Sequence, residues 1–284
     1  MVGMGVREDH AVLMRAMTSE DVPTAAAVGA EVGWPGRERR FGFFVGHPFC
    51  EAVAAEAGGE VVGIGFGTRN GAVGWIGLVC VRPAYQGSGI GAAITERVAK
   101  LMEERGCRTL ILTATEMGRR VYERLGFSTE THYRGFAGPG LEPGPLPPGL
   151  RRMRPEDLPS VCDLDRRMTG EDRGHLLRAL AGPGWVVEGE DGRVRGYYLP
   201  VPWGGGPLIT PDPTVAKALT RLARTLVGPD ETARFWITEM NGACLGLMEE
   251  MGFQAVRRLP RMARGEPLPW RPESLWGLFS LGKG

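Results

Sequence analysis

The sequence predicts an α/β protein made of two copies of one folding unit in tandem. Its 284 residues amount to about two domains of ~150 residues, and a hydrophobic content of 43% is enough to give each domain a core. Two stretches of the first copy also recur in the second. MRAMTSEDVP at 14–23 matches LRRMRPEDLP at 150–159, and ERLGF at 123–127 returns as EEMGF at 249–253. Stretches that recur in the same order indicate a duplicated unit.

A stretch rich in proline and glycine separates the two copies. Residues 138–149 read GPGLEPGPLPPG. Proline removes backbone donors and glycine adds chain entropy, so this stretch is expected to form neither a helix nor a strand ladder. The predicted division is therefore a first domain at 1–137, a linker at 138–149 and a second domain at 150–284.

The first domain is expected to open with a strand and two helices. Residues 12–17 have a strand-like pattern, and Thr18 or Ser19 can cap a helix that runs toward Val32. Acidic residues follow in its first turn, where they interact favourably with the helix dipole. A second helix is expected at 35–45.

Three strand-like runs come next, at 50–57, 61–68 and 72–81. Gly-Gly at 58–59 and Arg-Asn-Gly at 69–71 separate them, and both sequences suit tight hairpin turns. Strands joined by such short turns predict an antiparallel meander.

The clearest helical periodicity lies at 88–105. Apolar residues such as Ile90, Ile94 and Val98 recur at helical spacing, and Gly106 provides a stop. We expect a buried strand at 109–114, followed by a short helix at 117–125 and a strand at 127–136. The strands at 72–81 and 109–114 should then be parallel neighbours in a right-handed βαβ unit.

The second domain shows the same order more faintly. Its expected strands lie at 150–153, 185–190, 194–200, 232–237 and 254–262, and its expected helices at 156–165, 172–180, 214–226 and 244–251.

The composition excludes several classes of function. Lys and Arg number 34 against 33 Asp and Glu, so a net charge of +1 gives no general attraction to nucleic acid or to anionic membranes. No run approaches the ~18 apolar residues of a membrane span, and no signal peptide is evident, so a cytoplasmic location is expected. The five cysteines form no CxxC pair and the histidines at 10, 47, 132 and 175 have no ligand spacing, so neither disulfides nor a metal site is expected. Lysine occurs only at positions 100, 217 and 283.

A glycine-rich turn, QGSGIG at 86–91, joins the strand at 72–81 to the helix at 88–105. Amides at a helix N-terminus are unpaired and lie at the positive end of its dipole, and glycine lets a phosphate approach the backbone, so this turn suits a pyrophosphate. The pattern also satisfies the dinucleotide fingerprint GxGxxG/A. That interpretation fits poorly, because five residues separate the strand from the first glycine and a meander precedes it. No Gly-Lys-Ser/Thr follows the glycines, which excludes a P-loop.

Two motifs in this order resemble those of the GNAT N-acetyltransferase superfamily. Gln86, Gly89 and Gly91 fit its signature of Arg or Gln followed by x-x-Gly-x-Gly/Ala, and Tyr122 stands ahead of Gly-Phe at 126–127 as in its second signature. The whole chain further resembles bacterial tandem members in which a degenerate GNAT-like copy follows the first. The resemblance implies two domains, each with a mixed and mostly antiparallel sheet flanked by helices, and a splayed pair of parallel strands in the first.

The resemblance also implies an acetyl-CoA site between the splayed strands. The coenzyme-binding residues then expected are Val79, Cys80, Val81, Gln86, Gly87, Ser88, Gly89, Ile90, Gly91 and Thr115. Thr115 departs from the family pattern, because related enzymes often have asparagine there to contact the pantetheine. A primary amine would attack the thioester directly, with a backbone N–H near Val79 as oxyanion donor and Tyr122 as proton donor to the leaving thiolate.

The general base is not identified by the sequence. The strand at 72–81 contains no Asp, Glu or His, where some relatives place a base. The candidates are Glu31, Glu51, Asp165 and Glu239, or a chain of water molecules.

The second copy is expected to bind no coenzyme A. It has ITPDP at 209–213 in place of the glycine-rich turn, and its two prolines remove amides while Asp212 would repel a phosphate. It would instead form part of the acceptor pocket or act as a scaffold. The charged stretch at 165–173 would recognise a polar substrate or form a solvated salt-bridged face. The acceptor-site candidates are Trp34, Asp165 and Glu239.

The function expected from the resemblance is acetyl transfer from acetyl-CoA to a small-molecule primary amine. A protein-lysine acetyltransferase and a non-catalytic acyl-CoA sensor are the alternatives. Tyr122 beside an intact glycine-rich turn favours an enzyme over a sensor. The identity of the amine and the oligomeric state stay open at this point.

Overall fold

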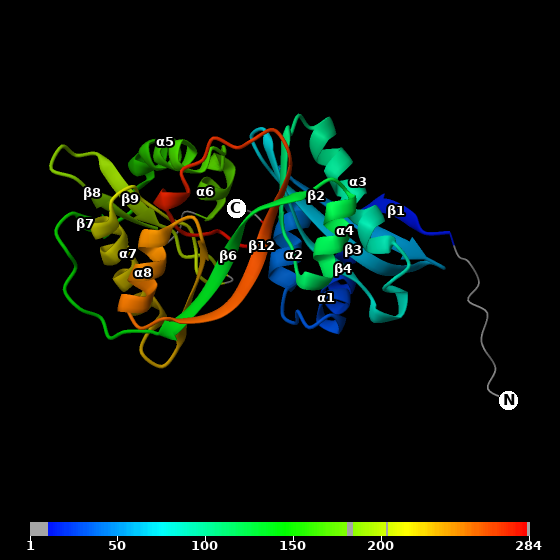
Figure 1. Ribbon diagram of the computed structural model, residues 1–284, viewed down its shortest axis with the longest axis horizontal. Coiled ribbons are helices and arrows are strands. Elements are labelled where there is room, and N and C mark those ends of the chain that lie inside the picture. The colour runs from blue at the N-terminus through cyan, green and yellow to red at the C-terminus, as the bar shows by residue number, and fades with distance from the viewer. Residues whose placement is uncertain (1–10, 181–183, 203, 283–284) are drawn as a thin grey trace.

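Two β-sheets flanked by helices make up the protein, and this arrangement confirms the predicted α/β class (Figure 1). The computed structural model describes residues 11–180, 184–202 and 204–282. We call residues up to 137 the first half and residues from 150 the second half. In Figure 1 the halves lie side by side, and the long strands β6 (Ser128–Pro139) and β12 (Gln254–Gly265) run together between them. No helix among the described residues is long and apolar enough to cross a membrane.

The elements of the first half agree with the sequence predictions to within a few residues. Before β6 they are β1 (Leu13–Ala16), α1 (Val22–Glu31), α2 (Glu38–Gly46), β2 (Cys50–Ala57), β3 (Glu60–Asn70), β4 (Val73–Val81), α3 (Ile90–Glu104), β5 (Thr109–Thr113) and α4 (Glu116–Arg124). Strands β2, β3 and β4 form the predicted antiparallel meander, and β4 pairs with β5 in parallel.

The second half repeats this order, with the short strand β10 in the place of β4, and then adds one short strand, β13. The sequence predicted neither β10 nor β13. Its elements besides β12 are β7 (Leu150–Arg152), α5 (Leu158–Thr169), α6 (Gly174–Leu180), β8 (Trp185–Glu188), β9 (Val194–Tyr198), β10 (Leu208–Ile209), α7 (Pro213–Val227), β11 (Thr232–Thr238), α8 (Gly242–Glu250) and β13 (Leu275–Gly277). Strand β10 pairs antiparallel with β9 on one side and with β13 on the other. Both short strands depend on these pairings, because their own residues show no strong strand pattern.

Strands of the second half take part in the sheet of the first. The larger sheet has the order β1-β2-β3-β4-β5-β12-β6-β11, and the smaller one has the order β13-β10-β9-β8-β7. Strand β12 therefore lies between β5 and β6 and pairs antiparallel with both. The halves are duplicated in sequence, but they share one sheet.

The expected linker begins later than predicted. Gly138 and Pro139 belong to β6 and pair with Ala233 and Thr232 of β11, so the expectation that 138–149 forms no ladder is wrong for these two residues. A proline is tolerated at this last register position because a missing donor costs little at a strand end. Glycine fits at 138 because a Cβ there would lie 2.7 Å from the Phe253 ring.

Helix α3 and the second half cover opposite faces of the larger sheet. Neighbouring residues of β4 show this division, since Ile76 packs in a core with α3 and Trp75 packs in another core with residues of α5 and α6. Helices α1 and α2 form a further core against β2 and β3. The second half thus buries part of the face of β4 and β5 that points away from α3.

Candidate active site

The parallel strands β4 and β5 separate halfway along β4. They pair only from Val73 to Ile76 on β4 and from Thr109 to Leu112 on β5. Beyond this point β4 pairs with β3 alone, and a bulge sets two residues of β4, Leu78 and Val79, between the partners of Ile64 and Phe66. The predicted splay is therefore present, and it opens toward the carboxyl ends of both strands.

The bulge imposes an unusual backbone conformation on Leu78. Its φ is 55°, and no other non-glycine residue in the described part of the chain has a positive φ. Such a conformation costs about 1–3 kcal/mol, and strained residues of this kind often occur at active sites. This backbone conformation lies at the point where the two strands part.

Two glycines of the glycine-rich turn have a left-handed backbone conformation. Gly87 and Gly89 have φ values of 81° and 88°, and Gly89 is the N-cap of α3. Two side chains secure the turn: Gln86 Nε2 donates to the Val81 carbonyl at 2.9 Å, and Ser88 Oγ donates to the Tyr85 carbonyl at 2.6 Å. The side chain of Gln86 therefore supports the turn from its strand side.

The amides of this turn are available to a ligand. In the described residues, none of the amides from Gly87 to Gly91 donates to a backbone carbonyl, and a Cβ added to Gly87 or Gly89 would meet no atom within 4 Å. Five consecutive amides at the N-terminus of a 15-residue helix thus have no backbone acceptor among the described residues. This arrangement fits a pyrophosphate, because the helix dipole and unpaired N–H groups both favour an anion.

Tyr122 lies on α4 near the splayed end of β4. Its ring packs edge-on against Phe127 with 6.3 Å between centroids, and no hydrogen bond of its hydroxyl is found among the described residues. Burial raises the pKa of Tyr122 to about 12, with a smaller contribution from Cys80 of β4. The hydroxyl therefore keeps its proton at neutral pH and can act only as a proton donor.

Thr115 caps the helix that carries Tyr122. Its Oγ1 accepts a hydrogen bond from the Gly118 amide at 3.2 Å. This role explains why threonine is suitable here, since Ser, Thr, Asp and Asn are the preferred N-caps. Its contact with the pantetheine stays a prediction.

Asp165 is part of the protein interior. It is completely buried, its Oδ1 accepts from Arg173 Nη2 at 2.5 Å and from the Tyr197 hydroxyl at 2.5 Å, and its Oδ2 accepts from Arg173 Nε at 3.0 Å. A carboxylate saturated in this way holds α5 to the following loop and to β9. In the stretch at 165–173, Asp165, Glu171 and Arg173 are thus buried, which differs from the solvated face that we expected. That expectation holds for Arg166 and Arg167, which are exposed and pair with Asp163 along α5.

The other carboxylate candidates for a base are held in ion pairs. Glu239 bridges Arg134 of β6 and Arg258 of β12 at 2.8 Å each, and these arginines lower its pKa to about 2. A carboxylate with so low a pKa is a weak proton acceptor. Glu31 pairs with Arg82, and Glu51 pairs with Arg105. The remaining acceptor candidate, Trp34, lies half-buried near α2 with the Arg37 guanidinium 5.7 Å from its ring.

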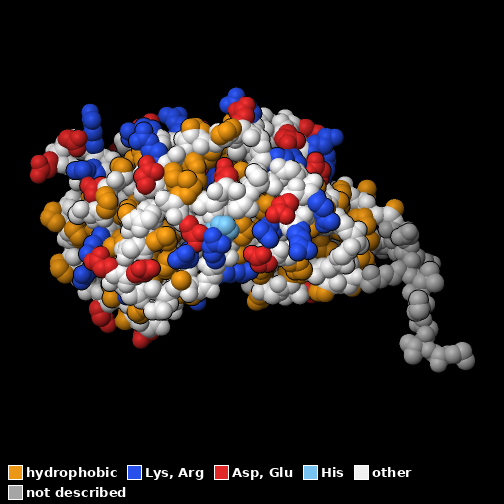
Figure 2. All heavy atoms as spheres, in the orientation of Figure 1, with side chains coloured by type: hydrophobic (Ala, Val, Ile, Leu, Met, Phe, Trp, Pro, Cys, Tyr) orange, Lys and Arg blue, Asp and Glu red, His pale blue; other side chains and the backbone are white. Residues whose placement is uncertain are grey.

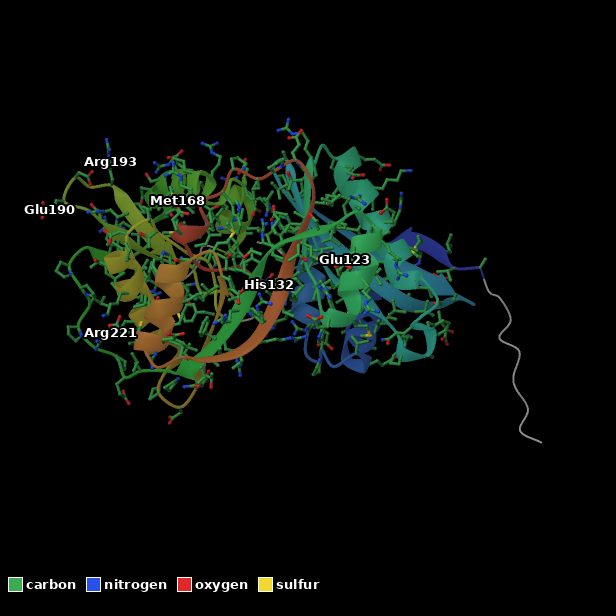
Figure 3. The ribbon with its side chains drawn as sticks, in the orientation of Figure 1. Glu123, His132, Met168, Glu190, Arg193 and Arg221 are labelled. Atoms are coloured by element: carbon green, nitrogen blue, oxygen red, sulfur yellow. The ribbon has the colours of Figure 1, made fainter. Side chains whose placement is uncertain are left out.

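Figure 3 places His132 on β6 between the halves and Glu123 on α4. His132 Nδ1 lies 3.9 Å from Glu239, and burial lowers the pKa of His132.

In the described residues no group of three or more His, Cys, Asp or Glu side chains is arranged to hold a metal ion; His10 lies outside them. Acidic and basic side chains are interspersed over the face seen in Figure 2.

Two features near the site had no signal in the sequence. Glu171, in the loop between α5 and α6, accepts hydrogen bonds from Asn70 Nδ2 at 2.6 Å and Trp75 Nε1 at 2.9 Å, which ties the second half to the β3–β4 hairpin. The segment after β13 also reaches the splay, where Thr113 Oγ1 donates to the Leu281 carbonyl at 2.9 Å. Both contacts join residues that are far apart in sequence and follow no periodic pattern.

In the second half, amides at the position that corresponds to the glycine-rich turn are already hydrogen-bonded. Asp212 caps α7, and its Oδ1 accepts from the amides of Thr214 at 2.9 Å and Val215 at 3.4 Å. Its Oδ2 accepts from Arg195 at 3.2 Å. A carboxylate of the protein thus occupies the amides that a phosphate would need. A groove of about 1150 Å³ lies beside this cap, with Met168, Glu190 and Arg193 among its lining residues (Figure 3).

Two family models match the chain, one in each half. Residues 21–127 match the acetyltransferase (GNAT) family, and residues 161–277 match an acetyltransferase (GNAT) domain. Among curated proteins, a glucosamine 6-phosphate N-acetyltransferase from Trypanosoma brucei brucei is 41% identical over 61 residues. That match covers 21% of this chain and 42% of the relative, so it spans less than half of the relative's length.

Solved structures share the fold over most of the chain. A Pyrococcus horikoshii protein proposed to be an acetyltransferase has a TM-score of 0.82 at 23% identity, and the match covers 100% of this chain and 99% of that one. A GCN5-related N-acetyltransferase from Sphaerobacter thermophilus has a TM-score of 0.62 at 17% identity, covering 91% and 98% of the two chains. Identities this low show a shared fold, and the coverage shows that both halves share it.

Proposed function

Since the chain belongs to the GNAT acetyltransferases, as a tandem N-acetyltransferase with two GNAT domains, we propose that it transfers an acetyl group from acetyl-CoA to a primary amine of a small molecule. The observation that carries this proposal is the first half's combination of splayed strands with a row of available amides at the N-terminus of α3. The second half lacks this combination because Asp212 occupies the corresponding amides.

The residues of the first half fit acetyl-CoA in two places. The amides from Gly87 to Gly91 would hold the pyrophosphate, and the open space around Gly87 and Gly89 leaves room for it. The backbone of Val79 to Val81 pairs with no residue of β5 in the described part of the chain, and it would pair with the pantetheine. At Val81 the carbonyl also accepts from Gln86 Nε2. When bound, acetyl-CoA supplies the activated acyl group.

The strained bulge would supply the oxyanion donor. Removing one such donor typically costs about 2.7–4 kcal/mol of transition-state stabilisation, and a donor held in place before reaction needs no reorganisation. An amide next to Leu78 is suited to this role because the bulge fixes its direction.

Tyr122 would protonate the departing thiolate. The raised pKa of Tyr122 ensures that the proton is present at neutral pH. The acceptor amine needs to lose only one proton, and we propose that water removes it, because Asp165 is buried in an ion pair and Glu239 has a pKa of about 2.

The second half would act as a wall of the acceptor side and as a structural support. It covers the face of β4 that carries Trp75, and it contributes β12 to the catalytic sheet. We therefore propose one coenzyme A per chain, bound in the first half.

A coenzyme A release assay across a panel of amines tests this function. The panel should contain amino sugars and their phosphates, amino acids, polyamines, aminoglycosides and lysine-containing peptides, and glucosamine 6-phosphate is included because of the trypanosomal relative. Release with a small amine, together with a calorimetric stoichiometry near one, supports the proposal. Activity on peptides alone would favour a protein-lysine acetyltransferase, and binding without turnover on any amine would favour the sensor.

A further inference from the structure

The segment that follows β13 runs from the second half to the sheet of the first half. Phe279 belongs to the core that joins the halves, is only 1% exposed, and has the Arg173 guanidinium 4.9 Å from its ring. Ser280 is also buried, and its Oγ accepts a hydrogen bond from the Gly282 amide at 3.3 Å. Packing and a local turn therefore hold Leu281 and Gly282 in place.

Two contacts seat Leu281 and Gly282 at the vertex of the splay, which we define as Gly77 on β4 and Thr113 on β5. These are the first residues of the two strands beyond their parallel pairing. The Leu281 carbonyl accepts from Thr113 Oγ1 at 2.9 Å, and a Cβ on Gly77 would be 2.9 Å from the Gly282 Cα. The main chain of the segment thus spans both strands at the vertex.

The segment lies on the face of the sheet that the second half covers. Residues two apart on a strand point to the same face. Trp75 and Ile111 precede Gly77 and Thr113 by two residues, and both belong to the core formed with the second half. A Cβ on Gly77 would point to this same face, where it meets Gly282. The segment therefore covers the vertex from the side of the second half.

The proposed acetyl-CoA site leads toward this vertex. The pyrophosphate would lie at Gly87 to Gly91 and the pantetheine would pair with Val81 and then with Val79, so the ligand would run along β4 in the direction of Gly77. The acyl group is attached at the end of the pantetheine arm, so it would come last, beside Leu78 and the vertex. A longer acyl chain would extend from there toward the segment.

We propose that the main chain at Leu281 and Gly282 limits the size of the donor's acyl group, so that the protein binds acetyl-CoA in preference to propionyl-CoA and longer acyl-CoA molecules. This inference rests on the proposed function and deepens it, because it assigns donor selectivity to a segment of the second half. The acetyl group ends in a methyl group, whereas each further methylene must displace atoms that the core holds in place. Close-packed interiors yield little to added methylenes.

Calorimetric titration of the full-length protein with four ligands tests this limit. Coenzyme A, acetyl-CoA, propionyl-CoA and butyryl-CoA share the nucleotide and the pantetheine and differ only at the acyl end. The wild type should bind butyryl-CoA at least tenfold more weakly than acetyl-CoA, with propionyl-CoA between them, because a single methylene in a closed pocket changes binding by about tenfold or more.

Thr113→Val removes the hydroxyl that holds the Leu281 carbonyl and keeps a side chain of similar size. A hydrogen bond of this kind contributes about two- to tenfold to an equilibrium, so the affinity gap between acetyl-CoA and butyryl-CoA should narrow by about two- to tenfold. Thr113→Ser keeps the hydroxyl and should keep the wild-type gap. Thr109→Val is the matched control at the other end of β5, where Thr109 Oγ1 donates to the Glu266 carbonyl at 2.7 Å, and it should also keep the gap.

Coenzyme A, which has no acyl group, separates this inference from the proposed function. Its affinity should be the same in all four proteins, because it does not reach the vertex. Equal wild-type affinities for acetyl-CoA and butyryl-CoA would overturn the inference, and so would a gap that Thr113→Val leaves unchanged or that Thr109→Val narrows equally. In these cases binding of coenzyme A leaves the proposed function standing. If neither coenzyme A nor acetyl-CoA binds the wild type, the proposed function itself fails.

Discussion

Replacing Gly89 with valine should abolish acetyl-CoA binding while leaving the fold intact. Gly89 has a φ of 88° and a Cβ there meets no protein atom within 4 Å, so the substitution creates no clash inside the protein. Its cost to stability is the left-handed conformation, which is at least about 1–2 kcal/mol. Its cost to binding is larger, because the branched side chain enters the space that a pyrophosphate would occupy.

The size of the expected signal follows from linkage. Acetyl-CoA at 100 times its Kd should stabilise the wild type by about 2.7 kcal/mol, which corresponds to a rise in Tm of about 5–10 °C for a chain of this size. Differential scanning fluorimetry with and without acetyl-CoA measures this rise. Gly89→Val should show a lowered starting Tm and no rise.

Gly106 provides the matched control at the other end of the same helix. It also has a φ of 88° and an unobstructed Cβ direction. Gly106→Val should therefore lower the Tm by a similar amount and keep the full rise with acetyl-CoA. An undiminished rise in Gly89→Val, or equal losses in both variants, would refute the assignment of the site to the α3 N-terminus.

Three further predictions concern catalysis, pH and assembly. Tyr122→Phe should reduce kcat by ~10²-fold with little change in acetyl-CoA affinity, because only a proton donor is lost; a near wild-type kcat in single-turnover assays would reduce Tyr122 to a packing residue. Burial raises the pKa of Glu171 to about 7 from an ordinary value of 4.5, so its contribution to stability is complete below pH 4.5 and is lost as the pH rises through 7. Urea unfolding from pH 4.5 to 8 should show the wild type losing stability relative to Glu171→Gln over this range, and parallel pH profiles would contradict this. Proteolytic nicking at 141–147 should leave one particle by size-exclusion chromatography, because β11 and β12 pair with strands of the first half. Separation of the fragments, or a stably folded fragment 1–140, would show that the shared sheet is not essential.

The sequence was sufficient to predict the bounds of helices and strands whose formation depends on their own residues. Strand β2 begins and ends where it was predicted, and α3 is bounded by the glycines at 89 and 106. The glycine-rich stretch does join a strand to a helix as expected, and the positive φ values of Gly87 and Gly89 explain why glycine stands there.

Features that depend on distant residues could not be predicted. A strand pattern at 254–262 does not say which neighbours β12 will have, and its place between β5 and β6 follows from packing of the two halves. Burial of Asp165 and Glu171 could not be predicted, since charged side chains are seldom buried unless paired. Their partners Asn70, Trp75 and Tyr197 lie far away in sequence. Burial of a paired charge is a property of the tertiary structure and leaves no periodic signal.

The position of β12 between β5 and β6 delays completion of the larger sheet until late in synthesis. About 140 residues separate the end of β5 from the start of β12, and a ribosome adding ~5–20 residues per second needs roughly 7–30 s to synthesise them. During this time the edge of β5 that β12 will cover exposes unpaired backbone groups, which makes the nascent chain prone to pairing with other strands. The first half therefore emerges early but reaches its final sheet only when the last part of the second half has been translated. Any translational pause before residue 265 therefore lengthens the period in which the uncovered edge of β5 can pair with other chains.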